Sequence, residues 1–446
     1  MMKQIHWGCD GKHLKRRDFL RVGALSSLGI GLSQYLSLKQ AVAALTGGEA
    51  AARAEACILV WLDGGPSQID TWDPKPNSSF KPIGTNVDGI QISETLPRLA
   101  KHVDKLALLR SVQTEEDNHV QASHYAATGH RPNTAMNFPA FGSIITRERG
   151  PRGNIPAHVM VPAMPKGKRY DEHFGAHFIG AEYDPMILPD PSDPDFAVPD
   201  LSLPSSVSTA ALEDRRSFLE IVDQSYRRQC RIAEFSNMDV FMDQAWNMIL
   251  SPEVREAFDL AQESENTIDA YGRDGPGQSL LLARRLVEAG SRFVTAGGYK
   301  SQAWDTHNTN DKHHLEELAP AFDRSFAALL EDLDQRGLLE STVVLVLGEF
   351  GRSPHLNPDF GRDHWPHCWS VVLAGGGIRG GQVVGASDDR GAYVAERRIS
   401  LGDVFATVYK AFGIDWTKEY MHPIGRPIKI ANAIEDKTGA PISEII

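Results

Sequence analysis

The feature that most constrains the fold is a continuous apolar run from Cys57 to Leu62, which ends abruptly at Asp63, Gly64 and Gly65. Continuous rather than alternating apolarity is typical of a strand buried on both faces of a parallel sheet. Similar runs predict further strands at Leu106–Leu109, Val343–Leu347, Ser370–Ala374, His158–Val161 and Phe293–Ala296. The chain is therefore expected to contain a mainly parallel sheet.

Helical patterns lie between these strands. Leu315–Leu333 carries apolar residues at three- and four-residue spacing, and Leu401–Phe412 does the same after a possible capping box formed by Ser400 and Asp403. Residues 211–290 have an almost uninterrupted helical pattern, which we interpret as a helical insertion at about 205–290. Strands that alternate with helices predict a three-layer α/β/α sandwich, in which ligands bind beyond the carboxyl ends of the strands.

The N-terminus has the pattern of a twin-arginine signal peptide. Arg16 and Arg17 precede two apolar residues, a mild apolar run from Val22 to Leu38, and the small residues at positions 41–43. We expect residues 1–45 to be removed on passage through the twin-arginine export machinery, and residues 46–446 to form the folded domain. The predicted location is the periplasm or the cell surface. A surface helix with a basic start is the alternative interpretation.

Composition narrows the class of protein. The formal net charge of -12 argues against a general nucleic-acid binder, which would carry basic stripes. After the first fifty residues no stretch is apolar for long enough to cross a bilayer, so we expect no transmembrane segment in the mature chain. Cys57, Cys230 and Cys368 remain after signal removal, and this sparse set is no disulfide framework. Whether any two of them form a bridge stays open.

Carboxylates and imidazoles recur just after the predicted strands. Each alone has a plainer interpretation as a turn former or helix cap, and His130 and His158 have no partner visible in the sequence. Together, however, groups from several strand ends predict a divalent-cation site, with Zn or Mn favoured over Ca because nitrogen and oxygen ligands are mixed. The residues at these strand ends are Asp63, Asn118, His119, His124, Asp305, His307, Glu349, Asp363, His364 and His367.

Five segments resemble the signatures of an exported bacterial family known as domain of unknown function 1501. They occur in the expected order over almost the whole mature chain, at Leu62–Pro76, Trp304–His307, Gly348–Pro354, Gly361–Pro366 and Leu373–Gly377. That family is similar in organisation to alkaline phosphatases, arylsulfatases and cofactor-independent phosphoglycerate mutases. The resemblance therefore implies an alkaline-phosphatase-like fold.

The resemblance also implies a ligand set for one or two divalent cations. The residues it places on the metal are Asp63, Asp305, His307, Glu349 and His364, with His119 and His367 as further ligands. Two departures put one metal position in question. Asp305 and His307 are closer together than the superfamily usually has them, and Glu349–Phe350 stands where an Asp–His pair is common.

The nucleophile is the largest departure. Thr128-Gly129-His130 resembles the end of a sulfatase signature, and counting back along that helix places the nucleophile at His119, beside Asn118. Neither is the Ser, Thr or modifiable Cys of a covalent mechanism. Three alternatives remain: a metal-bound hydroxide with His119 as ligand or base, attack by Ser111 or Thr114, or oxyanion binding without turnover.

These residues together suggest an exported metal-dependent hydrolase of phosphate or sulfate esters. His119 and Asn118 are the catalytic candidates. Arg352 and Arg362 would clasp the anionic group, unless they form surface ion pairs. Asp70 and Asp73 would orient the ligands, unless they only cap the loop after the first strand. The alternative function is a non-catalytic secreted protein that binds a sulfated or phosphorylated polymer, or a partner protein.

Overall fold

The computed structural model describes residues 52–163, 170–198, 211–212, 214–219, 245–246, 248–300 and 302–446. These residues belong to one unit of the chain, Ala52–Ile446. The predicted signal peptide, Cys230 and residues 220–244 of the predicted helical insertion lie outside the described residues.

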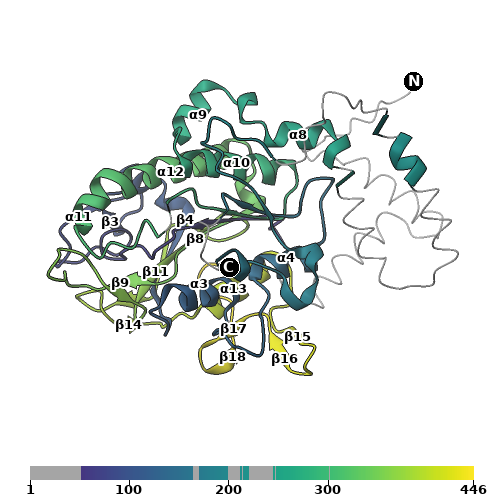
Figure 1. The fold of residues 1–446 in the computed structure, drawn as a ribbon. Coiled ribbons are helices and arrows are strands. Elements are labelled where there is room, and N and C mark those ends of the chain that lie inside the picture. Colours follow the sequence, from purple (N-terminus) through teal and green to yellow (C-terminus); the bar gives the residue numbers. More distant parts are fainter. Residues whose placement is uncertain are drawn as a thin grey trace, which may run out of the picture. The chain divides into compact units, whose positions relative to one another are not determined.

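A central sheet with eight described strands organises this unit (Figure 1). Its strands, in spatial order, are β12 (Gln382–Val384), β4 (Leu106–Val112), β11 (Trp369–Ala374), β8 (Thr342–Leu347), β1 (Ala56–Trp61), β7 (Phe293–Ala296), β5 (His158–Val161) and β6 (Met186–Ile187). β11 is antiparallel to both of its neighbours, β4 and β8, whereas the other pairs are parallel. The predicted mainly parallel sheet is therefore confirmed.

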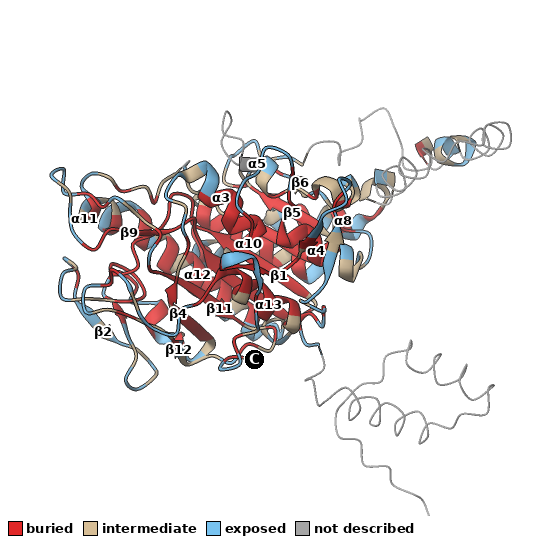
Figure 2. Cartoon of the chain, turned by 90° about the horizontal axis from the view of Figure 1, so that it is seen from below, coloured by how far each residue is buried: buried red, intermediate tan, exposed pale blue. Residues whose placement is uncertain are grey.

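Helices cover both faces of the sheet, as the sequence predicts. One face packs against α10 (Gly275–Ala289) and α12 (Ala319–Gln335), and the other against α3 (His119–Thr128), α4 (Phe141–Arg149) and α13 (Leu401–Ala411) (Figure 1). In β1, Ile58 and Val60 face the first helical layer, and Cys57 and Leu59 face the second. Because both faces are covered, every residue of β1 is buried. Figure 2 shows the same concentration of buried residues in the sheet and its covering helices.

The helical segment before β7 agrees in part with its prediction. The described part contains α8 (Pro252–Phe258), α9 (Glu265–Tyr271) and α10, each with its own side-chain N-cap, and the helical pattern is broken at Pro252, where α8 begins, and at Gly272, where α9 has ended. α10 packs on the sheet, so Gly275–Ala289 belongs to the sandwich and not to an insertion. The apolar pattern could not separate the two, because an inserted helix and a covering helix both bury one stripe.

The later helices agree more closely with the sequence. α11 (Asn310–His313) continues through a wider turn at His314–Leu318 into α12, and α13 begins with the expected capping box of Ser400 and Asp403. The remaining described elements are α5 (Tyr170–His173) and the pairs β2 (Pro82–Gly84) with β3 (Gln91–Ser93), β9 (Gly351–Arg352) with β10 (His364–Trp365), β13 (Ala386–Ser387) with β14 (Val394–Glu396), β15 (Glu419–Met421) with β16 (Pro427–Lys429), and β17 (Asn432–Ala433) with β18 (Lys437–Thr438).

One edge of the sheet gathers the residues singled out in the sequence. β1, β4, β7 and β8 all end there, and β11 starts there because it runs in the opposite direction. The loops after β4, β7 and β8 and the loop before β11 therefore meet at this edge.

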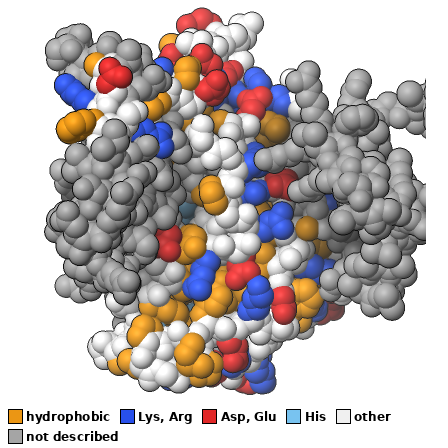
Figure 3. All heavy atoms as spheres, turned by 90° about the vertical axis from the view of Figure 1, so that its right-hand side faces the viewer, with side chains coloured by type: hydrophobic (Ala, Val, Ile, Leu, Met, Phe, Trp, Pro, Cys, Tyr) orange, Lys and Arg blue, Asp and Glu red, His pale blue; other side chains and the backbone are white. Residues whose placement is uncertain are grey.

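Three further properties of the described residues bear on the predictions. No helix among them is both long enough and apolar enough to cross a membrane. Cys57 and Cys368 are buried free thiols, and burial raises the pKa of Cys368 to about 12. On the face drawn in Figure 3, basic and acidic side chains are interspersed, with apolar side chains between them.

Candidate metal centre

Five of the predicted site residues meet at this edge and form what we call the histidine–carboxylate cluster. Its members are His119 at the start of α3, Asp305 and His307 after β7, Glu349 after β8, and His364 at the start of β10. Within it, potential ligand atoms of His119, Asp305 and His364 all lie within 4.8 Å of one another. The structure thus brings together groups that are as much as 245 positions apart, as 364 is from 119, in the sequence.

Asp305 is the centre of the cluster. Its Oδ2 lies 3.2 Å from His119 Nε2, and its Oδ1 lies 3.1 Å from His364 Nε2. The same Oδ1 is 3.2 Å from His307 Nε2, and the Nε2 atoms of His307 and His364 are 3.0 Å apart. Three imidazole nitrogens therefore lie within 3.2 Å of one carboxylate.

The other nitrogen of each imidazole, Nδ1, faces an oxygen atom. The pairs are His119 with Glu349 Oε2, His307 with Asp363 Oδ1 at 2.9 Å, and His364 with the carbonyl oxygen of Asp117 at 2.5 Å. Because a carboxylate or carbonyl oxygen accepts, each Nδ1 carries the hydrogen, and each neutral ring keeps its lone pair on Nε2. This is the arrangement in which metal-binding histidines are usually held.

The spacing and chemistry of these atoms fit a divalent cation. Ligand atoms bonded to zinc at about 2.1 Å in a tetrahedron lie roughly 3.4 Å apart, close to the 3.0–3.2 Å separations in the cluster. Without a cation, facing lone pairs repel unless a proton lies between them. Accordingly, although burial lowers it, hydrogen bonds to Asp305 and Glu349 raise the pKa of His119 to about 9.

Arg352 supports Asp305 from below the surface. Its Nη2 lies 2.5 Å from Asp305 Oδ1, and its other donors bond to backbone carbonyls, among them Gly65 at 2.9 Å. Burial favours the neutral acid, but hydrogen bonds from His119 and His364 and the charge of Arg352 outweigh it and hold the pKa of Asp305 well below its usual range. The carboxylate of Asp305 is therefore held in its anionic form.

The prediction that Arg352 and Arg362 clasp the substrate is not supported. Both side chains are fully buried, and their donors are engaged within the protein. Arg362 pairs with Asp70 through Nε at 2.7 Å and Nη2 at 3.3 Å. The sequence could not distinguish these arginines from exposed ones, because burial is decided by the loops packed around them.

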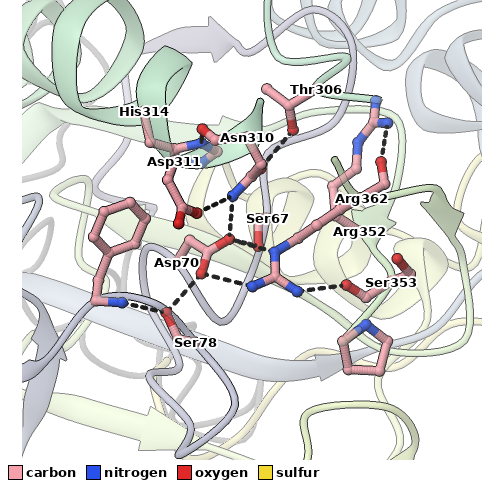
Figure 4. A network of polar contacts seen from close by, with 12 residues as sticks. Ser67, Asp70, Ser78, Thr306, Asn310, Asp311, His314, Arg352, Ser353 and Arg362 are labelled. Atoms are coloured by element: carbon pink, nitrogen blue, oxygen red, sulfur yellow. Dashed lines mark hydrogen bonds and ion pairs between the residues drawn. The ribbon is translucent and has the colours of Figure 1, made fainter. Parts of the chain in front are cut away.

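Asp70 is the anchor of the loops that carry the cluster (Figure 4). Its carboxylate accepts hydrogen bonds from Ser67 at 2.7 Å, Ser78 at 2.6 Å and Asn310 at 3.0 Å, as well as from Arg362. Although burial raises it, Arg362 and these partners give Asp70 a lowered pKa. The network links the loop after β1 to α11 and to the segment before His364, which supports the predicted orienting role.

The two remaining aspartates occupy different places. Asp63 is buried next to the cluster, where its carboxylate accepts from Trp61 Nε1 at 3.4 Å and from the backbone of Gln302 at 2.5 Å. Asp73 pairs with Lys75 at 3.2 Å and Arg110 at 3.6 Å. These contacts of Asp73 do not reach the cluster, so its predicted orienting role is not supported.

Glu349 contacts His119 at Nδ1, whereas Asp305 lies near Nε2 on the other side of the ring. The fully buried carboxylate of Glu349 accepts from Ser123 Oγ at 2.7 Å through one oxygen and from His119 through the other. Burial raises the pKa of Glu349, and His119 only partly offsets this. With both oxygens engaged, Glu349 is better placed to orient His119 than to bind a cation.

Two further predicted residues have other surroundings. The exposed Asn118 caps α3, with its side chain accepting from the backbone N–H of Val120 at 3.1 Å. His367 is exposed and its ring lies 4.9 Å from that of Trp365 and 5.6 Å from that of Tyr393. Neither side chain joins the cluster.

The candidate hydroxyl nucleophiles are all buried. Ser111 Oγ donates to the carbonyl of Arg397 at 2.5 Å, and Thr114 is 1% exposed. Ser123, four residues after His119 on the same helix face, is held by Glu349. Attack by Ser111 or Thr114 would need their burial to be undone.

Two contributors, Phe350 and Ser123, were not among the predicted site residues. Asp363 was among the strand-end residues predicted for a cation site, but its bond to His307 was not predicted. Phe350 was noted only as a departure, and its ring lies 4.4 Å from that of His364 and 5.3 Å from that of His119. Ser123 offered only its helical spacing from His119.

Two glycines allow the loop with Asp305 and His307 to approach its neighbours. Gly64 has a φ of +107°, and a Cβ there would lie 2.5 Å from the backbone nitrogen of Asp305. A Cβ on Gly361 would collide with the carbonyl carbon of His307. The loop is therefore clamped between two backbone segments that admit no side chain.

Comparisons with known proteins identify a family but no reaction. The family described as "Protein of unknown function (DUF1501)" matches residues 54–446. No curated protein matches the chain. Similar solved structures include a lipoteichoic acid synthase from Listeria monocytogenes (10% identity, 88% of this chain and 79% of that chain, TM-score 0.38) and the PsFucS1 sulfatase from Pseudoalteromonas sp. (13%, 91% and 77%, 0.39). Another is alkaline phosphatase from the Antarctic bacterium TAB5 (15%, 73% and 92%, 0.36). Similarities at this level do not specify a reaction.

Proposed function

Because the chain belongs to the DUF1501 family, whose description names no activity, we propose from its site that the protein is an exported, metal-dependent hydrolase of phosphate or sulfate esters. One observation carries the proposal. Three histidines, each with Nδ1 held by an oxygen, place Nε2 within 3.2 Å of the single carboxylate of Asp305. This is the arrangement in which metal-binding histidines are usually held.

His119, Asp305 and His364 are the proposed ligands of one divalent cation, with zinc or manganese favoured. When bound, the cation would supply positive charge to polarise an ester oxygen and to lower the pKa of water. Three protein ligands leave a position open for water or substrate, as in catalytic zinc sites. Phe350 shields one side of the two imidazoles from solvent.

His307 and Asp363 form the open side of the cluster. The His307 side chain is 42% exposed and that of Asp363 is 53% exposed, compared with 14% for His119. His307 also lies near enough to Asp305 and His364 to bind the same ion. Its exposure and its bond to Asp363 favour a second role, in which the pair takes up and returns a proton during hydrolysis.

The central experiment measures metal and turnover in the same preparations. We expect purified protein to contain about one Zn or Mn per chain by elemental analysis and to hydrolyse an aryl phosphate or an aryl sulfate. Asp305→Asn and His364→Ala should lose both metal and turnover, whereas His307→Ala should keep most of the metal and lose turnover. Absence of stoichiometric metal from the unmodified protein would refute the proposal.

Matched controls lie close to the altered residues. His367→Ala removes an exposed histidine three positions after His364, and Asp389→Asn removes an exposed carboxylate outside the cluster. Both variants should retain metal and turnover. If His367→Ala abolished metal binding as His364→Ala does, the assignment of the ligand set would be wrong.

A non-catalytic binding protein is the second candidate. The burial of Ser111, Thr114 and Ser123 favours it, because none of these three hydroxyl groups is exposed beside the cluster. Such a protein would bind a sulfated or phosphorylated polymer or a partner protein without turnover. It would retain the metal yet hydrolyse no ester even in single-turnover assays with excess protein.

Export is a separate part of the proposal. It depends on Arg16 and Arg17 in the twin-arginine pattern. Replacing both by lysine should leave the protein in the cytoplasm, as judged by cell fractionation. A periplasmic marker exported by the general secretory route should be unaffected in the same cells.

A further inference from the structure

A groove away from the histidine–carboxylate cluster lies between α12, α9 and the segment 98–102. Its volume is about 350 Å³. α12 contributes Arg324, Ala327, Ala328 and Glu331, whose spacing of three and four residues places them on one face of the helix. The small side chains of Ala327 and Ala328 form the floor of the groove. Figure 1 shows α9 beside α12, the two helices that form the groove together with the 98–102 segment.

The third wall carries two cations, Arg98 and Lys101, that form no ion pair with a described residue. Arg98 and Lys101 are exposed, and neither side chain has a hydrogen bond or ion pair with a described residue. Arg98 is the N-cap of the 3₁₀-helix Leu99–Lys101 and Lys101 is its last residue, so they occupy positions i and i+3, whose side chains lie on the same side of such a helix. Two cations outside ion pairs lie at one hollow, in a chain of net charge -12, and the charge of Arg98 also acts on the nearby carboxylate of Asp323.

The wall is fixed before any ligand arrives. The carboxylate of Asp323 on α12 accepts the backbone N–H of Arg98 at 3.0 Å and that of Leu99 at 2.8 Å. These bonds use backbone donors, so they leave the side chain of Arg98 available. A wall that is already ordered loses less entropy when a ligand binds.

The other charged residues of the groove are largely compensated. His102 Nε2 lies 3.1 Å from Glu331 Oε1 at one end. Arg324 at the other end pairs with Asp274 and donates to the carbonyl of Tyr271 at 3.2 Å. Among the described residues that line the groove, Arg98 and Lys101 are therefore the Lys and Arg side chains outside ion pairs.

We propose that this groove binds a small organic molecule that carries one phosphate or sulfate group. A guanidinium beside an ammonium matches a tetrahedral oxyanion, the first by paired hydrogen bonds and the second as a point charge. The floor of Ala327 and Ala328 contacts the uncharged part of the ligand. A volume of about 350 Å³ lies at the lower end of the range for ligand pockets, which limits the ligand to a small molecule. The inference does not depend on the reaction proposed for the cluster.

Two stable anions test the groove without being hydrolysed: phenylphosphonate and benzenesulfonate. Binding is measured by calorimetry, and protection of Lys101 from acetylation is followed by mass spectrometry. We expect saturable binding of at least one anion and protection of Lys101, while the exposed Lys81 outside the groove is acetylated as before. The arm that binds more tightly identifies the phosphate or sulfate preference.

Two variants make the outcome decisive. Arg98→Ala keeps the backbone bond to Asp323, so the fold should persist, and it should weaken binding by roughly tenfold or more. Ala328→Glu should abolish protection of Lys101, because it fills the floor and adds negative charge. Binding that Arg98→Ala leaves unchanged, or an unprotected Lys101 in the presence of saturating anion, would overturn the proposal.

Discussion

His119 and His124 lie five positions apart on the same helix, α3, yet their surroundings drive their protonation in opposite directions. His119 lies between Asp305 and Glu349; although burial lowers its pKa, hydrogen bonds to the two carboxylates raise it to about 9. His124 is buried, its Nδ1 lies 2.9 Å from the carbonyl oxygen of His130 and 3.4 Å from Thr128 Oγ1, and burial lowers its pKa to about 4.

The same contrast extends beyond α3. The pKa values of His130 and His158 are also lowered to about 4 by burial, which backbone carbonyls at 2.9 and 3.1 Å do not offset. In contrast, the cluster collects full negative charges around its imidazoles. The difference teaches that a buried histidine is prepared for a cation by its carboxylate neighbours and not by burial itself.

The largest expected effect breaks the cluster while leaving the buried histidines intact. Gly361→Ala places a Cβ against His307, so the loop with Asp305 must move. We expect loss of metal binding and a destabilisation of about 1 to 3 kcal/mol in denaturant unfolding, as for other overpacked sites. Gly84→Ala is the matched control, because a Cβ there meets nothing within 4 Å. Normal metal content in Gly361→Ala would show that the clamp is dispensable.

Glu349→Gln should make His119 resemble His124. The amide cannot supply the negative charge that raises the pKa of His119, so that pKa should fall, as measured by NMR titration of metal-free protein. Metal affinity should fall by roughly 10- to 100-fold, as for other partners of metal-binding histidines. Glu396→Gln, at an exposed position, should change neither quantity. An unaltered affinity in Glu349→Gln would contradict the orienting role.

Lowering the pH should reveal how much the buried histidines His124, His130 and His158 contribute to the free energy of unfolding. Their pKa is about 4 in the folded protein and 6.5 as the ordinary value, so the unfolded chain takes up protons first as the pH falls. The stability they contribute is complete above about pH 6.5 and is lost progressively toward pH 4, by about 1 to 3 kcal/mol for each histidine. Urea unfolding at several pH values measures this loss.

His124→Asn provides the control for that measurement. The side-chain amide can still donate to the carbonyl of His130 but does not titrate in this range. The variant should lose less stability between about pH 6.5 and pH 4 than the unmodified protein. An equal loss would assign the acid sensitivity to other groups.

The smallest expected effect concerns Asn118. Asn118→Ala removes the cap of α3 and should cost about 1 kcal/mol of stability. Because the side chain faces the helix N-terminus and not the cluster, metal content should be unchanged and any turnover largely retained. Asn118→Ser, which can still cap, should recover most of the stability. Loss of turnover by at least about a hundredfold at full metal content would instead restore Asn118 as a catalytic residue.

Part of the site could be predicted from the sequence because the ends of the strands could be predicted from their apolar runs. Asp63, Glu349 and the Asp305–His307 pair follow apolar runs, and the ends of neighbouring parallel strands must meet at one edge. His364 was placed there although β11 runs in the opposite direction, because a loop that enters an antiparallel strand starts at that same edge. Nothing in the sequence around Arg352 and Arg362 predicted that these side chains are buried.

The sequence by itself determined the strands, the covering helices and the edge at which polar residues collect, because burial on both faces imposes continuous apolarity and a covering helix imposes its own period. Only the tertiary structure decided which histidine acquires a carboxylate. Sequence alone does not distinguish His119 from His124. Glu349 and Asp305, which follow separate strands, lie beside His119, and no such group reaches His124 in the described structure. The charged groups around an imidazole come from segments that are far apart in the sequence, and only the fold decides how close these groups lie to it.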